Sequence, residues 1–319
     1  MPQRFLDQQI PLAQMDAATR DVPPENYCNV SLYMCDNVYK GLPWEPANIT
    51  EQQDHRRKYR AAVSWTDFNV GRVLSTMEQE GFAENTAVVF HGDHGWHLGE
   101  QGGWCKQSNF DLVARVPLIV YVPWLPQSHG VRTSAMVEIV DLMPTTIELF
   151  DIGPTLPDLQ QLEGTSFMPL LIQPTLAPSL WKNATFTQYP RCDSSSVFTR
   201  TDPETGLAPW NYPSDNACTS VEDNGFAAMG YSIRTDRWRY TLWLQWDGAK
   251  LDKVSWNAVH GEELYDHEGD DGFDTDKFDN VNLGCASPQT APVCAVHKAA
   301  LEAGWGAAKP KPAAYAGLS

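Results

Sequence analysis

The sequence predicts an α/β protein in which a mostly parallel sheet is flanked by helices and is followed by a smaller antiparallel subdomain. Three features favour this class. Apolar residues recur at helical spacing over residues 59–77, two short apolar runs follow at 87–90 and 118–122, and an aromatic hairpin lies at 230–244. Strands that alternate with helices are typical of α/β proteins, because the helices bury the two faces of a parallel sheet.

The first predicted element is a long amphipathic helix, preceded by an irregular segment at 1–47 that is rich in Pro, Asn and Asp. Thr50 and Gln53 have the spacing of a capping box, and Gly81 is a typical helix terminator. Between them the apolar positions follow the period of a helix, so we expect one buried stripe. These positions are Tyr59, Ala62, Val63, Thr66, Val70, Val73, Leu74 and Met77.

Two buried strands and a second helix are predicted next. The runs 87–90 and 118–122 are short, apolar and rich in β-branched residues. A helix is expected from about residue 141 to 150, because Gly153 and Pro154 follow it.

Beyond about residue 155 the sequence changes to Pro- and Asp-rich loops with short strands. Residues 230–234 and 238–244 predict an antiparallel hairpin that turns at Thr235 and Asp236. The aromatic residues of this hairpin are expected in its core rather than on a sugar-binding surface; they are Trp238, Tyr240 and Trp243.

Length and charge bound the organisation of the chain. Its 319 residues predict two domains, at 1–155 and 156–308, and a disordered Lys-, Pro- and Ala-rich tail at 309–319. The formal net charge of −17 argues against nucleic acid as a partner, because phosphates are bound by clustered Lys and Arg. No stretch approaches the ~20 apolar residues of a membrane span. The acidic run 266–279 is interpreted as a solvated loop. The sequence does not predict the oligomeric state.

Cysteines and glycosylation sequons favour a secretory or lysosomal protein. By proximity, the seven cysteines predict up to three disulfides, with Cys105 left unpaired. The pairs are Cys28 with Cys35, Cys192 with Cys218, and Cys285 with Cys294. Acceptor patterns for N-glycosylation begin at Asn29, Asn48 and Asn183. No signal peptide follows Met1, so we expect that the amino terminus of the full protein lies upstream.

A polar cluster directly follows the first predicted strand, at the position where α/β sheets bind ligands. Asp93 offers a hard oxygen ligand to a divalent cation, and His94 offers a nitrogen ligand or a hydrogen bond to an anion. After a glycine-rich loop, Lys106 can donate to a sulfate or phosphate oxygen, and a cation and an ammonium together would stabilise an oxyanion. A capped turn and a solvated lysine are the alternative interpretation, and His97 is interpreted as a loop histidine.

The segment around this cluster resembles the second signature of the sulfatase family, of the iduronate-2-sulfatase type. The similarity runs from His91 through Lys106 and continues at 108–111 and 115–118. Further blocks in the family's order lie at 137–145, 162–164, 188–191, 229–235 and 261–266. Together the blocks cover most of residues 1–285, so the resemblance is far more specific than a single motif.

The resemblance implies an alkaline phosphatase-like fold and a sulfuric ester hydrolase that acts on sulfated saccharides such as glycosaminoglycans. It implies that Asp93 and His94 bind Ca²⁺ and that Lys106 contacts the sulfate ester. Arg234 would lie in the small domain and help to bind the sugar. The full-length parent would be a lysosomal or secreted glycoprotein.

The sequence departs from the family at the nucleophile. No cysteine begins a Cys-x-Pro-Ser-Arg motif, whose Cys becomes the catalytic formylglycine in the family. We therefore expect a carboxy-terminal part of a sulfatase, without a catalytic residue of its own and with formylglycine supplied upstream. Two alternatives stay open: an inactive remnant or truncated gene model, and a phosphodiesterase or phosphonate hydrolase of the same fold. A sheet without its amino-terminal strands would expose apolar edges, which predicts poor solubility.

Overall fold

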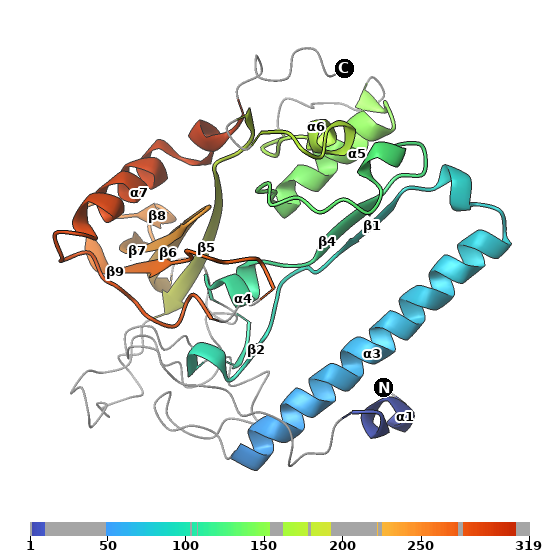
Figure 1. Ribbon diagram of the computed structural model, residues 1–319. Helices are drawn as coiled ribbons and strands as arrows, with labels where there is room; N and C mark the ends of the chain where they lie inside the picture. Colours follow the sequence, from blue (N-terminus) through green and yellow to red (C-terminus); the bar gives the residue numbers. More distant parts are fainter. Residues whose placement is uncertain are drawn as a thin grey trace.

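A computed structural model describes residues 2–9, 49–102, 104–106, 108–153, 162–177, 180–192, 222, 225–273 and 277–310. Figure 1 shows three main parts, of which the first is the long helix α3 (Ile49–Gln79). The second is a two-stranded sheet, β1 (Val88–His91) with β4 (Leu118–Tyr121), and the third is a five-stranded antiparallel sheet. Most of the segment 1–47 and of the predicted tail lies outside the described residues.

The predicted long helix is confirmed, but its apolar stripe is largely exposed. α3 has 31 residues, and the turn that follows it contains Gly81 at a φ of 77°, a conformation that favours glycine. Within the segment predicted to be irregular, α1 (Gln3–Asp7) forms a short helix that packs Phe5 against α3. Val63 and Val73 of the stripe are 54% and 68% exposed, so the described residues do not bury it.

β1 and β4 pair in an antiparallel ladder that places Phe90 opposite Ile119. The α/β class is confirmed, yet every ladder between the described strands is antiparallel, so the mostly parallel pairing is not found among them. A parallel pair needs a crossover, usually a long helix, on the face of the sheet. The connection 92–117 instead folds into a loop with one short helix, α4 (Asp111–Ala114), and the chain returns in the opposite direction.

One face of this strand pair packs on a hydrophobic core. Val120 and the fully buried Val122 contact a cluster that includes side chains from α5 (Leu142–Leu149) and α6 (Met168–Ile172). The helix expected at 141–150 is therefore confirmed as α5. The cluster joins residues on both sides of position 155, and the domain boundary there stays a prediction.

The five-stranded sheet forms the second core. It consists of β5 (Ala184–Cys192), β6 (Phe226–Thr235), β7 (Trp238–Asp247), β8 (Asp252–Lys253) and β9 (Val259–Asp266), with β7 also pairing with β9. α7 (Ala291–Ala303) packs on it through Cys294 and Leu301, and the predicted disulfide Cys285–Cys294 is present. The predicted hairpin and the burial of Tyr240 and Trp243 are confirmed. The other two predicted disulfides, Cys28–Cys35 and Cys192–Cys218, involve residues or side chains outside those that the structure describes.

Short elements complete the described part. They are η3 (Ala83–Asn85), β2 (His97–Leu98), η4 (Glu100–Gly102), β3 (Trp104–Cys105), η5 (Pro126–Ser128), η6 (Ile139–Asp141) and η11 (Trp305–Ala308). None of the described helices is long and apolar enough to span a membrane.

Candidate functional site

Asp93 and His94 lie in the loop that leaves the end of β1. The backbone N–H of His94 donates to Asp93 Oδ1 at 3.0 Å, and Asp93 Oδ2 lies 3.5 Å from His94 Nε2. His94 Nδ1 lies 2.8 Å from the carbonyl oxygen of Gly95, so this nitrogen carries the proton and Nε2 presents its lone pair. A carboxylate oxygen and an imidazole lone pair therefore converge beside the end of β1.

The ammonium group of Lys106 reaches the same point from a second segment. Lys106 follows β3, which pairs with β2 and so returns the chain toward the loop after β1. Its Nζ lies 2.9 Å from His94 Nε2 and donates to it. The structure thus brings together the three residues that the sequence analysis placed in one site, while their roles stay predictions.

The site is open to solvent on the side of Asp93. The Asp93 side chain is 85% exposed, whereas the His94 side chain is 28% exposed. The hydrogen bond from the His94 backbone N–H lowers the pKa of Asp93, and the charge of Lys106 acts in the same direction. Asp93 therefore presents a charged carboxylate to a ligand at neutral and mildly acidic pH.

Two glycines let the backbone of this loop lie against the neighbouring segments. Gly95 N–H donates to Val113 O at 2.8 Å, and a Cβ at Gly95 would lie 1.8 Å from Leu112 O. No other residue fits there unless the backbone moves. Gly92 N–H donates to Pro117 O at 3.1 Å, so the loop is held at both ends.

His97 fixes the hairpin that carries Lys106. It is 1% exposed, its Nδ1 lies 3.1 Å from Glu100 O, and its Nε2 lies 2.9 Å from Ser108 Oγ. Its interpretation as a loop histidine is wrong, because His97 lies in strand β2 and its buried ring contacts Phe110 edge-on. Burial lowers the pKa of His97 to about 4, so the ring is neutral under most conditions. Glu100 in turn pairs with Arg56 at 2.6 Å and ties the hairpin to α3.

The donor set fits part of a divalent cation site. Asp93 supplies a hard, charged oxygen and His94 a neutral nitrogen with its lone pair available. Ca²⁺ takes about 6–8 ligands, mostly oxygens, so Asp93 and His94 can hold it only together with further oxygen ligands. Lys106 would neutralise an anion bound on the same cation.

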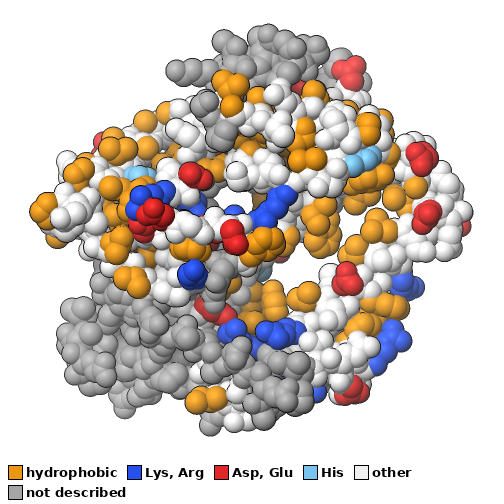
Figure 2. All heavy atoms as spheres, viewed as in Figure 1, with side chains coloured by type: hydrophobic (Ala, Val, Ile, Leu, Met, Phe, Trp, Pro, Cys, Tyr) orange, Lys and Arg blue, Asp and Glu red, His pale blue; other side chains and the backbone are white. Residues whose placement is uncertain are grey.

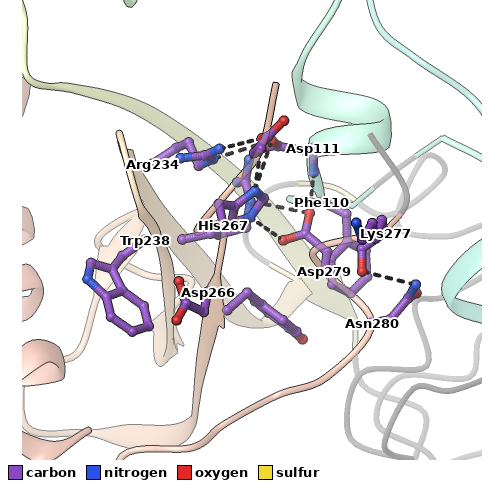
Figure 3. A network of polar contacts seen from close by, with 12 residues as sticks. Phe110, Asp111, Arg234, Trp238, Asp266, His267, Lys277, Asp279 and Asn280 are labelled. Carbon is purple, nitrogen blue, oxygen red and sulfur yellow. Dashed lines mark hydrogen bonds and ion pairs between the residues drawn. The ribbon is translucent and has the colours of Figure 1, made fainter. Parts of the chain in front are cut away.

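A second polar cluster lies where the five-stranded sheet meets the loop that follows Lys106. Figure 3 shows His267 between Asp111 and Asp279, with Arg234 beside Asp111. His267 Nε2 lies 2.9 Å from Asp279 Oδ1, and Asp279 Oδ2 accepts from the Asp111 backbone N–H at 2.6 Å. The buried guanidinium of Arg239 donates to Asp111 and is 3.5 Å from Asp279. The cluster joins α4 to β6, β7 and the segment after β9.

The structure places Arg234 in this cluster. Arg234 Nε lies 3.3 Å from Asp111 Oδ2, its Nη2 lies 2.9 Å from Asp270 Oδ2, and its Nη1 donates to the carbonyl oxygens of Thr235 and Asp236. Its side chain is 11% exposed. Protein acceptors thus face all three guanidinium nitrogens, which favours a structural role for Arg234.

Asp270 and Asp279 correct the interpretation of residues 266–279 as a solvated loop. Their side chains are only 4% and 0% exposed, although Asp266 and Glu268 remain more accessible. The reason is that arginines distant in sequence neutralise the buried carboxylates, as at Asp270, which lies 2.8 Å from Arg115. Charge composition alone does not reveal such partners.

One oxygen from each of Asp111 and Asp270 and a nitrogen of His267 lie within 4.8 Å of one another, which is close enough to hold a metal ion. However, both carboxylates already accept from guanidinium groups, including Arg115 and Arg234. A cation added here would meet positive charge that is already in place, so the cluster is an ion-pair network.

Comparisons with known proteins identify the family of the chain. The sulfatase family model matches residues 19–152. Iduronate 2-sulfatase of Mus musculus is 31% identical over 280 residues, which cover 76% of this chain and 47% of that protein. The chain belongs to the sulfatase family. This sulfatase-family chain spans about half the length of the curated relative, so the activity of a whole sulfatase is a separate question.

Solved structures share the fold of this sulfatase-family chain. A phosphonate monoester hydrolase of Agrobacterium radiobacter superposes with a TM-score of 0.64 at 18% identity, covering 95% of this chain and 53% of that one. A protein solved with its substrate D-glucosamine-2-N,6-O-disulfate has a TM-score of 0.53 at 23% identity, covering 80% and 43%. At these identities the likeness shows an alkaline phosphatase-like fold and no more.

Sequence reasoning missed the residues that support the site of this sulfatase-family chain. His97, Arg239 and Asp279 are buried in polar contacts that join distant segments. For His97 the signal is weak, because β2 has only two residues, whereas alternation predicts a strand over about 4–8 residues. For Arg239 and Asp279 the partners lie in other elements, and no local pattern identifies them.

Proposed function

We propose that this chain forms half of the active site of a sulfuric ester hydrolase. What carries the proposal is the convergence of Asp93 Oδ2, His94 Nε2 and Lys106 Nζ at the end of β1, with 3.5 Å and 2.9 Å between neighbouring atoms. In this role Asp93 and His94 hold a divalent cation, Ca²⁺ by the preference of carboxylate oxygens, and Lys106 binds the sulfate. The bound cation would draw negative charge from the sulfate oxygens.

The residues of this chain have definite parts in the reaction. Lys106 donates a hydrogen bond to a sulfate oxygen and stabilises charge that develops as the ester bond breaks. Its ammonium now contacts His94 Nε2, so binding of a cation at His94 would release Nζ toward the sulfate. His97 keeps the hairpin of Lys106 in place, since both of its ring nitrogens bond within the same loop. The nucleophile is not among the residues of this chain, which has no Cys-x-Pro-Ser-Arg motif.

We propose a sulfated saccharide, such as a glycosaminoglycan, as the substrate class, as in the iduronate-2-sulfatase type. The similarity to iduronate 2-sulfatase over 76% of this chain supports this choice. We propose for Arg234 a role in holding Asp111 and Asp270 rather than the direct contact with sugar that the resemblance implied. A phosphonate hydrolase is the second candidate, because a phosphonate monoester hydrolase has the same fold.

We also propose that the full protein is a secreted or lysosomal glycoprotein. The disulfide Cys285–Cys294 supports an oxidising compartment, where such bonds persist. Asn183 supports glycosylation, because it begins an acceptor sequon and is exposed just before β5.

The proposed function is tested on the protein purified from its natural source with an antibody against residues 225–273. Hydrolysis of 4-nitrophenyl sulfate is compared with hydrolysis of a 4-nitrophenyl phosphonate ester, with calcium and after its removal by a chelator. We expect calcium-dependent hydrolysis of the sulfate ester to exceed that of the phosphonate. A preference for the phosphonate would favour the second candidate, and no hydrolysis of either ester would favour an inactive remnant.

A further inference from the structure

His267 is a buried histidine whose two ring nitrogens both face carboxylates. It directly follows β9 and is 2% exposed. Its Nε2 lies 2.9 Å from Asp279 Oδ1, and its Nδ1 lies 3.3 Å from Asp270 Oδ2. A neutral imidazole carries a proton on only one nitrogen, so the other nitrogen would present a lone pair to a carboxylate, whereas an imidazolium donates from both. The contacts therefore favour an imidazolium at this position.

Asp270 is an ionised acceptor beside His267 Nδ1. Burial alone would raise the pKa of Asp270, but hydrogen bonds and charges, chiefly the backbone N–H of Gly272 and the charge of Arg115, lower it. An ionised carboxylate has no proton to donate. The proton in the contact between Asp270 and Nδ1 must therefore belong to His267.

The charges around His267 are buried, unlike those of the ion pairs on the protein surface. Figure 2 shows Lys and Arg side chains next to Asp and Glu side chains on one face of the molecule, where water and salt screen them. The side chains of Asp111, Asp270 and Asp279 are at most 4% exposed. Three arginines balance these carboxylates, and water screens the further positive charge of an imidazolium at Arg115, whose side chain is 42% exposed. Shielded hydrogen bonds between charged groups are the stronger kind, so we expect them to fix their partners.

Asp279 connects His267 to the segment that follows Lys106. Asp279 Oδ2 accepts from the backbone N–H of Asp111, the first residue of α4, at 2.6 Å (Figure 3). Its other oxygen contacts His267, so the ring and the start of α4 share one carboxylate. A change at His267 that rotates Asp279 would therefore release the start of α4.

The segment 108–111 supports Lys106 from the side of the five-stranded sheet. At its first residue, Ser108 Oγ lies 2.9 Å from His97 Nε2 in the hairpin of Lys106. Next along the chain, Asn109 Nδ2 donates to a backbone carbonyl of β6 at 3.2 Å. The contact at the start of α4 holds the other end of the segment, so loss of this contact would widen the range of positions of Lys106.

We propose that His267, as an imidazolium, is a positioning residue for Lys106. It holds Asp279 against the start of α4 and so fixes the segment that adjoins Lys106. The link from His267 to this segment rests on the geometry alone. The link to hydrolysis rests on the proposed function, in which Lys106 binds the sulfate.

Hydrogen exchange measures the link to the segment without any assay of activity. The protein is produced from its own gene in the source organism, as the wild type and as His267→Gln, whose side chain is uncharged. We expect peptides within 108–114 to exchange at least about tenfold faster in His267→Gln, because a hydrogen bond to a charged group is lost. Peptides of β7 should exchange as in the wild type, which shows that the sheet stays folded.

His297→Gln is the matched control, because His297 is another buried histidine. Its Nδ1 lies 2.7 Å from Val293 O and its Nε2 lies 3.2 Å from Thr235 Oγ1, so its hydrogen-bond partners among the described residues are neutral. This variant should leave exchange in 108–114 unchanged. If His267→Gln does not accelerate exchange in 108–114, or if both variants accelerate it equally, the proposal is overturned.

Two further variants test the charge of the ring and the path through Asp279. His267→Lys keeps a positive charge, so its exchange in 108–114 should be slower than that of His267→Gln. Asp279→Asn keeps an acceptor without the negative charge, and the addition of His267→Gln to it should have no further effect. Equal exchange in His267→Lys and His267→Gln would overturn the charged ring, and effects that multiply in the double variant would overturn the path.

Hydrolysis of 4-nitrophenyl sulfate tests whether His267 acts through Lys106. A misplaced Lys106 should lower kcat by about 10–10²-fold in His267→Gln. In Lys106→Met the same change should lower kcat by no more than about twofold, because the group that His267 positions is already absent. Equal losses in both backgrounds would indicate a general structural role and overturn the proposal. A wild type that hydrolyses no sulfate ester would remove the proposed function, whereas the exchange rates would still decide the link to the segment.

Discussion

Replacement of Arg239 by Met should destabilise the five-stranded sheet strongly. The Arg239 side chain is 3% exposed; it donates to Asp111 and to the carbonyl oxygen of Asn109, and its Nε lies 3.5 Å from Asp279. Removal of one partner from a buried ion pair costs about 3–5 kcal/mol, because it leaves an uncompensated charge. Arg234, at 3.3 Å from Asp111, offsets part of this cost, so we expect the lower end, about 3 kcal/mol.

Urea unfolding followed by tryptophan fluorescence measures this change. With an m value of roughly 2 kcal/mol/M, a loss of about 3 kcal/mol lowers the unfolding midpoint by about 1.5 M. Arg237→Met is the matched control, because Arg237 also lies beside the β6–β7 turn but pairs with Asp266 and Glu268 at the surface. Its midpoint should stay that of the wild type, since exposed ion pairs contribute little.

The double variant Arg239→Met/Asp111→Leu separates the charge effect from the packing effect. Replacement of both members of a buried pair by apolar residues is often close to neutral, so the double variant should be more stable than Arg239→Met alone. Equal midpoints for Arg239→Met and the wild type, or strictly additive losses in the double variant, would refute the view that buried charge holds these elements together.

Three further predictions follow from the same structure. Between pH about 6.5 and about 4 the unfolded chain binds a proton at His97 whereas the folded chain does not, so the free energy of unfolding should fall by about 3 kcal/mol as the pH drops through this window. In His97→Gln the urea midpoint should change less with pH than in the wild type. Equal dependence on pH in the two proteins would exclude His97 as the cause. Gly95→Ala should lower the free energy of unfolding by roughly 1–3 kcal/mol or more, because the added Cβ overpacks the loop. Gly71→Ala should raise it by about 0.5–1 kcal/mol, because a Cβ has open space at this position of α3. Melting temperatures that shift in the same direction in the two variants would contradict this. Lys182→Met should lower the free energy of unfolding by about 3–5 kcal/mol, because the buried Asp141 and the partly buried Glu138 lose their counter-charge, and an unchanged urea midpoint would disprove the pairing.

Local patterns in the sequence predict the elements and the site loop well. The helical period of α3, the apolar runs at β1 and β4 and the alternation of the β6–β7 hairpin all identify elements that the structure contains. The position of Asp93 and His94 after a strand, with Lys106 beyond a glycine-rich loop, likewise identifies three side chains that meet. Each of these inferences depends on residues close in sequence.

Relations between distant segments account for what the sequence did not predict. Short apolar runs indicate burial but not strand direction, and so they do not predict the antiparallel pairing of β1 with β4. Asp111 and Arg239 are 128 residues apart, and nothing near either residue identifies the other. The acidic run around Asp270 looked solvated for the same reason, since its arginine partners belong to other elements.

The exposure of the α3 stripe has a different origin. Its period correctly indicated a helix with one face made for burial, yet Val73 remains 68% exposed in the described structure. The described residues therefore leave much of this face uncovered. This agrees with a chain that spans about half the length of its curated relative.

The most direct test of the account is the effect of Lys106→Met on hydrolysis of 4-nitrophenyl sulfate by the protein produced from its own gene in the source organism, where any partner is present. The account predicts that kcat falls by about 10²–10³, because a donor to the developing negative charge is lost. The control Lys253→Met, in which an ammonium over Tyr231 and Trp256 is removed far along the chain, should keep the wild-type kcat. A wild-type kcat in Lys106→Met would contradict the assignment of Lys106, His94 and Asp93 to the sulfate site.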